Sequence, residues 1–396
     1  MPHDSTLIAT IAVGLAFAFV GGFLADRLRL PPLVGYLAAG VAVGPFTPGF
    51  IADAHLAPQL AEIGVILLMF GVGMHFSIGD LWTVRSIALP GAIAQIAAAT
   101  AMTVAVASLW GWSFGSAAVF GLALSVASTV VLLRALHDRG RLETQDGRIA
   151  VGWLIVEDLA MVLALVLLPA LSGPLGGHAV GGSAATGDLW VALGLALGKV
   201  ALFIALMLVV GTRLFPWLLE RVERTGSREL FTLGVIALAI GIGYGSARLF
   251  QVSFALGAFF AGMVVKQSDL SHRAAIDLQP LQDVFAVLFF VAVGMLFDPT
   301  IVTRQPLQVL AVVAIVMIGK SLAAFGIVLA LGHPLRTALT VSAALAQVGE
   351  FSFVLAALGG ALGLLPPEAS SLVVAGALIS ITLNPLVFKA VERWAR

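Results

Sequence analysis

Two adjacent acids, Glu157 and Asp158, stand in the middle of an otherwise apolar run that extends from Ile149 to Leu171. Ionised side chains are costly inside a bilayer, so acids at the centre of a membrane helix are kept mainly where they handle an ion or a proton. A carboxyl group in a medium of low dielectric can hold either a proton or a metal ion, and each displaces the other. The pair therefore indicates a site that binds cations and exchanges protons.

Asp158 is the first candidate for the exchanging carboxylate and for the direct ligand of a monovalent metal ion; the alternative is a structural carboxylate paired to another helix. Glu157 points about 100° away round the helix, so it cannot share all of the contacts of Asp158. It either binds a second proton or pairs with a cation elsewhere. Lys320, in another apolar segment, needs a buried partner. An acid of 149–171 is the natural one, and Lys320 is either a fixed counter-ion or a group that releases its proton when a cation arrives.

Neutral oxygen atoms for a dehydrated alkali ion are offered by Ser128, Thr129 and Gln347. Small hydroxylated residues also help membrane helices to pack, so packing and ligation stay as alternatives for each of these residues. Glu350 follows Gln347 by about one helical turn, which makes it a candidate for a position in a cavity or a gate.

Composition places these residues in a membrane protein that crosses the bilayer many times. Of the 396 residues, 60% are hydrophobic and only 11% are charged, and the mean hydropathy is +1.08. The formal net charge is zero, which excludes the basic surface typical of nucleic-acid binding. The chain has no cysteine, so it has neither disulfides nor cysteine-ligated metal.

Apolar segments of membrane-spanning length recur along the chain and predict an all-α fold with about thirteen transmembrane helices. They fall at roughly 7–25, 32–46, 58–78, 86–109, 114–136, 149–171, 189–211, 229–247, 252–266, 280–297, 307–331, 337–360 and 368–390. Most of the 21 basic residues lie in the loops that alternate on one side and in the C-terminal tail, whereas Arg248 and Arg304 lie on the other side. The positive-inside rule then predicts an N-terminus outside and a C-terminus in the cytoplasm, as in a bacterial inner membrane protein.

The segments 114–136 and 337–360 both place small and polar residues at mid-depth. Inverted repeats with broken helices that meet at the membrane midplane are a common design of transporters. We therefore predict a single transport domain with inverted halves at about 7–171 and 229–390, joined by a linking helix at about 189–211.

Seven segments, in order along nearly the whole chain, resemble the cation:proton antiporter-2 family and its Kef-type potassium/proton antiporters in particular. These segments are 33–46, 60–78, 123–136, 152–163, 253–264, 285–299 and 346–355. The resemblance implies a sodium/proton antiporter-like fold of thirteen helices with a core domain and a dimerisation domain, and two crossed, partly unwound helices at 114–136 and 337–360. It also implies that Asp158 is the essential ion-binding aspartate and that Lys320 is the family's basic residue.

The function that the resemblance implies is exchange of a monovalent cation for protons by elevator-type alternating access in a homodimer. Potassium is the first expectation and sodium the second, with no cofactor. The chain departs from the family in having Glu157 before the aspartate, where many members have glutamine or aspartate, so the coupling ratio stays open. Many relatives continue into a cytoplasmic nucleotide-binding domain; none is expected in this chain, and a regulatory domain or subunit would lie outside it.

Three other functions are compatible with buried acids. A cation channel is disfavoured because Lys320 would stand in the membrane beside the pore. An intramembrane hydrolase would need acids that face each other from separate helices, whereas Glu157 and Asp158 are adjacent. A cation-coupled carrier of an organic solute is the more plausible alternative. We therefore expect a transporter rather than an enzyme.

Overall fold

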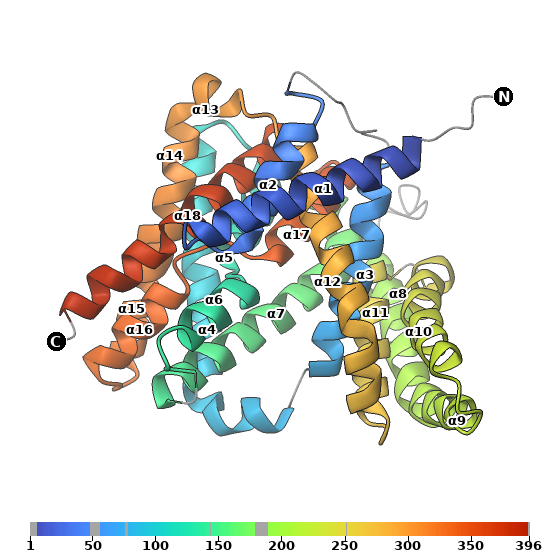
Figure 1. Ribbon diagram of the computed structural model, residues 1–396. Helices are drawn as coiled ribbons and strands as arrows, with labels where there is room; N and C mark the ends of the chain where they lie inside the picture. Colours follow the sequence, from blue (N-terminus) through green and yellow to red (C-terminus); the bar gives the residue numbers. More distant parts are fainter. Residues whose placement is uncertain are drawn as a thin grey trace.

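The computed structural model describes residues 6–47, 56–75, 78–142, 144–178, 189–250 and 252–394, and these form an assembly of helices (Figure 1). The α-helices and two π-helical stretches, η2 and η3, are α1 (Thr6–Arg27), α2 (Pro32–Val43), α3 (Ala57–His75), α4 (Ile78–Leu109), α5 (Phe114–Ser125), α6 (Thr129–His137), α7 (Gln145–Leu171), α8 (Leu189–Leu206), η2 (Met207–Gly211), α9 (Thr212–Glu223), α10 (Arg228–Phe250), α11 (Phe254–Lys266), α12 (Ser271–Met295), α13 (Ile301–Arg304), α14 (Pro306–Ala314), η3 (Ile315–Gly319), α15 (Lys320–Ala330), α16 (Leu335–Ala344), α17 (Glu350–Ala361) and α18 (Glu368–Trp394).

The expected all-α membrane fold is confirmed. Within the described residues, 10 helical stretches are long and apolar enough to cross a bilayer, and α2, α11 and α17 are shorter apolar helices at further expected segments. The helix expected at 189–211 is longer in the structure, because α8 continues through η2 directly into α9, which ends at Glu223; that it links two inverted halves stays a prediction.

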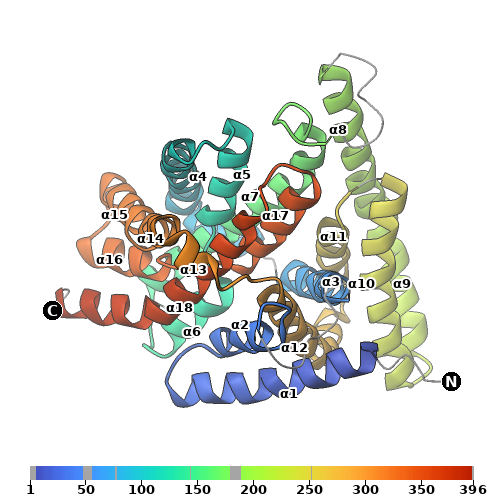
Figure 2. The same cartoon turned by 90° about the horizontal axis from the view of Figure 1, so that it is seen from above.

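The helices pack as two bundles. α1–α3 pack with α10–α12, and η2 and α9 lie against α10 and α11; together with α8 we call these helices the scaffold bundle. α4–α7 pack with α13–α18, and we call these the core bundle. Figure 2 shows α8, α9 and α10 at one side of the molecule and α14, α15 and α16 at the other, with α7 and α17 between them. Contacts between the two bundles are few compared with the contacts inside each.

Two helices of the core bundle are broken, and their breaks meet. Segment 114–136 is interrupted between α5 and α6, and segment 337–360 is interrupted between α16 and α17. The Gly349 amide donates to the carbonyl oxygen of Val126 across the meeting point, over 3.1 Å. A Cβ atom at Gly349 would lie 2.4 Å from the Ala127 carbonyl oxygen, so the close approach requires glycine. The predicted pair of crossed, partly unwound helices is therefore confirmed.

Candidate cation and proton site

Unwound backbone inside a bilayer leaves amide and carbonyl groups that need partners, and buried charged side chains supply them here. The Ala127 amide donates to Oε2 of Glu157 over 2.9 Å, and Nζ of Lys320 donates to the carbonyl oxygen of Gln347 over 2.6 Å. Glu157 and Lys320 are both completely buried. The acid thus serves an amide near the positive N-terminal end of α6, and the base serves a carbonyl just beyond the negative C-terminal end of α16, as helix dipoles favour.

The Gln347 side chain ties the two breaks together. Its Oε1 atom accepts from the Ser128 amide over 2.9 Å, and its Nε2 atom donates to the Ser128 carbonyl oxygen over 3.1 Å. The Ser128 hydroxyl caps α6 by accepting from the Val131 amide. We call Glu157, Lys320, Gln347 and Ser128 the crossing brace. Ligand roles for Ser128, Gln347 and Glu157 stay predictions, because each of these side chains already has a bonding role inside the brace.

Of the acids of α7, Glu157 is the one whose charge acts on Lys320. The π-helical stretch η3 ends at Gly319, immediately before Lys320. A π-helical turn shifts the direction in which the next side chains point, and such turns occur often at functional sites. After this turn, the Lys320 ammonium group points at the break between α16 and α17. Asp158, on a different face of α7 from Glu157, faces the cavity instead.

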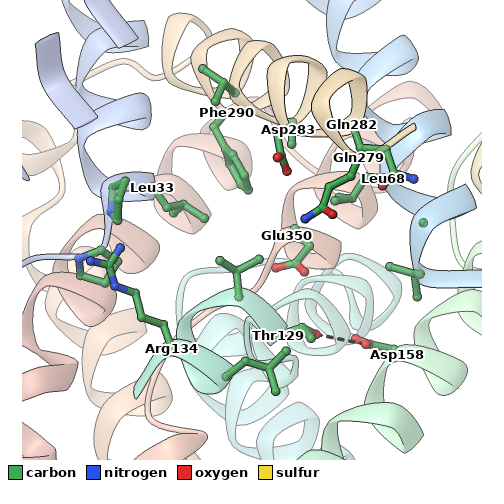
Figure 3. Close-up of a pocket in the computed structure, with 18 of the residues that line it drawn as sticks. Leu33, Leu68, Thr129, Arg134, Asp158, Gln279, Gln282, Asp283, Phe290 and Glu350 are labelled. Carbon is green, nitrogen blue, oxygen red and sulfur yellow. Dashed lines mark hydrogen bonds between the residues drawn. The ribbon is translucent and has the colours of Figure 1, made fainter. Parts of the chain in front are cut away.

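Asp158 lines a cavity of about 810 Å³ between the bundles. Of the two adjacent acids, Asp158 lines the cavity and is 9% exposed, whereas Glu157 is 0% exposed and does not line it. Thr129, the first residue of α6, donates its hydroxyl to Oδ2 of Asp158 over 3.2 Å (Figure 3). The other carboxyl oxygen, Oδ1, is buried and has no hydrogen-bond partner.

Glu350, the first residue of α17, lines the same cavity and is only 3% exposed. In Figure 3 its carboxyl group points toward the side of the cavity where Thr129 and Asp158 lie. The structure therefore brings Asp158, Thr129 and Glu350 to one cavity and places the crossing brace behind it.

The opposite wall contains two glutamines that the sequence did not point to, together with Asp283, for which helix capping or pairing between helices was the expectation. Gln279, Gln282 and Asp283 of α12 line the cavity, and Figure 3 shows them across from Thr129 and Asp158. Their spacing of three and four residues puts them on one face of a helix, so a search for polar residues at helical intervals would have found them. Gln282 also donates from Nε2 to the Leu67 carbonyl oxygen over 3.2 Å, inside the scaffold bundle.

An ion pair connects the bundles at the cavity. Arg134 of α6 lines the cavity, and its Nη2 atom lies 2.7 Å from Oδ1 of Asp26 at the end of α1. The two side chains are 41% and 61% exposed. Val130 lines the same cavity and is 49% exposed, so the cavity opens to the surface on this side of the molecule.

The side chains that could bind a cation in the cavity carry carboxylate, hydroxyl and amide groups. Oxygen atoms of these groups are the ligands that hard cations prefer. In the part of the chain that the structure describes, no group of three or more His, Cys, Asp or Glu side chains is placed to hold a metal ion.

The sequence matches a known family of membrane transporters. The family model of the transmembrane sodium/hydrogen exchangers matches residues 15–394. The chain belongs to this family. Together with the relatives named next, this match confirms the resemblance to the cation:proton antiporter-2 family, and the chain is a cation/proton antiporter that lies in a membrane.

Named relatives agree with this assignment. The chain is 60% identical over 394 residues to YbaL of Escherichia coli strain K12, which its name proposes to be a cation/proton antiporter, and the match covers 100% of this antiporter and 70% of YbaL. It is 31% identical over 390 residues to K(+) efflux antiporter 4 of Arabidopsis thaliana, covering 98% of this antiporter and 64% of the plant protein. The sodium proton antiporter MjNhaP1 of Methanocaldococcus jannaschii shares the fold, with a TM-score of 0.68 at 14% identity over 98% of this antiporter and 99% of MjNhaP1.

Proposed function

We propose that this antiporter exchanges a monovalent cation for protons at Asp158. The observation that carries the proposal is that Asp158 alone of the adjacent acids reaches the cavity between the bundles, with one carboxyl oxygen bonded to Thr129 and the other buried without a partner. A carboxylate in such a place binds a proton or a cation in turn. Release of the proton to one side and capture of a cation there, followed by exposure to the other side, gives exchange without covalent chemistry.

The division into bundles supports an elevator mechanism. Asp158, Thr129 and the crossing brace all belong to the core bundle, and the facing wall of the cavity belongs to the scaffold bundle. The brace hydrogen-bonds the two breaks to each other within the core bundle, so the site can move as a rigid body. We propose that the core bundle shifts against the scaffold bundle, which carries Asp158 from one side of the membrane to the other.

Potassium is the proposed cargo and sodium the alternative. The name K(+) efflux antiporter on the plant relative favours potassium, whereas the name of MjNhaP1 points to sodium. A cation-coupled carrier of organic solutes is the less favoured alternative, because the names of the relatives give cations and protons as cargo. Since the basic loops are expected in the cytoplasm, we place the Arg134 side of the cavity there, in a bacterial inner membrane, and we propose a homodimer.

Ion flux in liposomes tests the function. Purified protein is reconstituted in vesicles that contain a pH-sensitive dye, and the dye response to K⁺, Na⁺, Li⁺ and Rb⁺ is recorded between pH 6 and 9. We expect proton movement that depends on K⁺, and on Na⁺ if sodium is the cargo. Proton movement that requires an added organic solute would support the carrier alternative, and no response to any alkali ion would refute exchange.

The ion pair between Asp26 and Arg134 gives a prediction for the elevator. Surface ion pairs contribute up to about 1 kcal/mol, so Asp26→Asn should lower the population with this cavity open by at most about fivefold. The chain has no cysteine, so a cysteine substituted at Val130 is the single thiol, and its labelling rate with a membrane-impermeant maleimide reports the open population. We expect slower labelling in Asp26→Asn.

The exchanged pair Asp26→Arg with Arg134→Asp is the control and should restore the labelling rate. The side of the membrane from which the maleimide reaches position 130 also tests the proposed orientation. Equal labelling rates in all variants would show that this ion pair does not affect the population of the state in which the cavity is open.

A further inference from the structure

Glu350 combines features that its position on a helix does not explain. It is the first residue of α17, where a carboxylate stabilises the helix through the macrodipole. Stabilisation of this kind requires only a negative charge near the helix N-terminus, so an exposed carboxylate would be sufficient. Glu350 is 97% buried instead, being 3% exposed, and its Oε2 atom has no hydrogen-bond partner. A buried carboxylate oxygen without a partner is costly unless a cation or a proton compensates the charge.

Glu350 and Asp158 have similar surroundings, which suit both side chains to bind the same cation. Both acids line the cavity and each has a buried, unpartnered carboxyl oxygen. Asp158 lies close enough to Glu350 to feel its charge, as it feels that of its neighbour Glu157. The Ser128 side chain lies beside the Glu350 carboxyl group, and Figure 3 shows Thr129 on the side toward which that group points.

Other charged groups near the cavity are already engaged or lie farther along it. Arg134 is paired with Asp26, and Lys320 donates to the Gln347 carbonyl oxygen inside the crossing brace. Asp283 lies on the opposite wall, in the scaffold bundle. No base of the described residues that line the cavity is therefore placed to neutralise Glu350, apart from the already paired Arg134.

We propose that Glu350 is a second carboxylate ligand of the transported cation, so that the ion is held between α7 and α17 with the Thr129 hydroxyl beside it. This inference rests on the proposed function. Asp158 of α7 and Glu350 of α17 both belong to the core bundle and would travel with the ion. Loss of Glu350 should weaken cation binding, whereas loss of Asp158 should abolish exchange.

Cation dependence of transport and of stability tests the proposal. In proteoliposomes, Glu350→Gln should raise the apparent KM for the cation roughly tenfold or more, because one charge-assisted contact is lost, while the rate at saturating cation falls much less. In purified protein, the increase of Tm that the cation produces should shrink in the same variant, since a ligand stabilises the folded state according to its affinity. Glu350→Asp, which keeps the charge, should fall between wild type and Glu350→Gln.

Glu368→Gln is the matched control, because Glu368 is likewise the first residue of a helix, α18, and does not line the cavity. A structural role in the helix dipole would lower Tm in both variants and leave the cation-induced shift unchanged. If Glu350→Gln is too unstable to purify, Glu350→Asp carries the KM test. Equal KM values in wild type and the Glu350 variants, with exchange lost in Asp158→Asn, would refute this inference alone. Absence of exchange in the wild type would refute the proposed function itself.

Discussion

Asp158→Asn is expected to abolish coupled exchange and to leave the protein folded. The amide has nearly the shape of the carboxylate but can neither take up a proton at neutral pH nor offer a full negative charge to a cation. Because the variant also removes a buried charge next to Glu157 and Glu350, its Tm should equal or exceed that of the wild type. Proteoliposome flux and thermal unfolding of the same preparation check both expectations.

Asp298→Asn is the control for this variant, since Asp298 lies in the loop that follows α12. Hydrogen bonds from the hydroxyl and the amide of Thr300 hold the pKa of the Asp298 carboxyl below its usual range. That variant should keep exchange and should lose the modest stability of the loop contact. Cation-dependent proton flux that persists in Asp158→Asn would overturn the role assigned to Asp158.

Gly349→Ala is expected to lower both the stability of the core bundle and the rate of exchange. Its Cβ atom would lie 2.4 Å from the Ala127 carbonyl oxygen and 2.9 Å from the Ser128 amide nitrogen. These are backbone atoms, so the two breaks must separate to admit the methyl group. Overpacking of this kind costs about 1–3 kcal/mol, and displacing Thr129 and Glu350 by a fraction of an ångström should reduce exchange roughly tenfold or more.

Gly360→Ala provides the matched control on the same helix, because a Cβ atom there meets nothing within 4 Å. Alanine is a better helix former than glycine, so this variant should be as stable as the wild type or more stable. Thermal unfolding and proteoliposome flux distinguish the two variants. If Gly349→Ala matched Gly360→Ala in both measurements, the close crossing of the breaks would not be required for function.

Several features of this antiporter follow from the sequence because they depend on local composition. Apolar runs of bilayer length predict membrane helices wherever they occur. Acids inside such runs indicate a functional site even when the fold is unknown. The pair Glu157 and Asp158, the buried Lys320 and the polar residues at 125–129 and 347–350 could be selected in this way. The direction of Glu157 away from Asp158 followed from helical geometry alone.

Assignment of separate roles to those residues required the tertiary structure. Residues more than two hundred positions apart, such as Ser128 and Gln347, bond to each other only because two broken helices cross. The sequence could not show that Glu157 serves the Ala127 amide while Asp158 faces a cavity. It also could not show that Glu350 of α17 lies near Asp158 of α7, or that Asp26 reaches Arg134 across two bundles.

The physical reason is that the cost of burying a charged side chain can be read from the residues around it in the sequence. The partner that offsets this cost depends on the packing of the whole molecule. A charged residue in an apolar run reports by itself that compensation is needed. Which group provides the compensation depends on how helices distant in the chain are packed, and neither spacing nor composition contains that information. The sequence therefore determined the membrane fold class and the set of candidate residues, and the packing of the bundles decided which of them brace the crossing and which face the cavity.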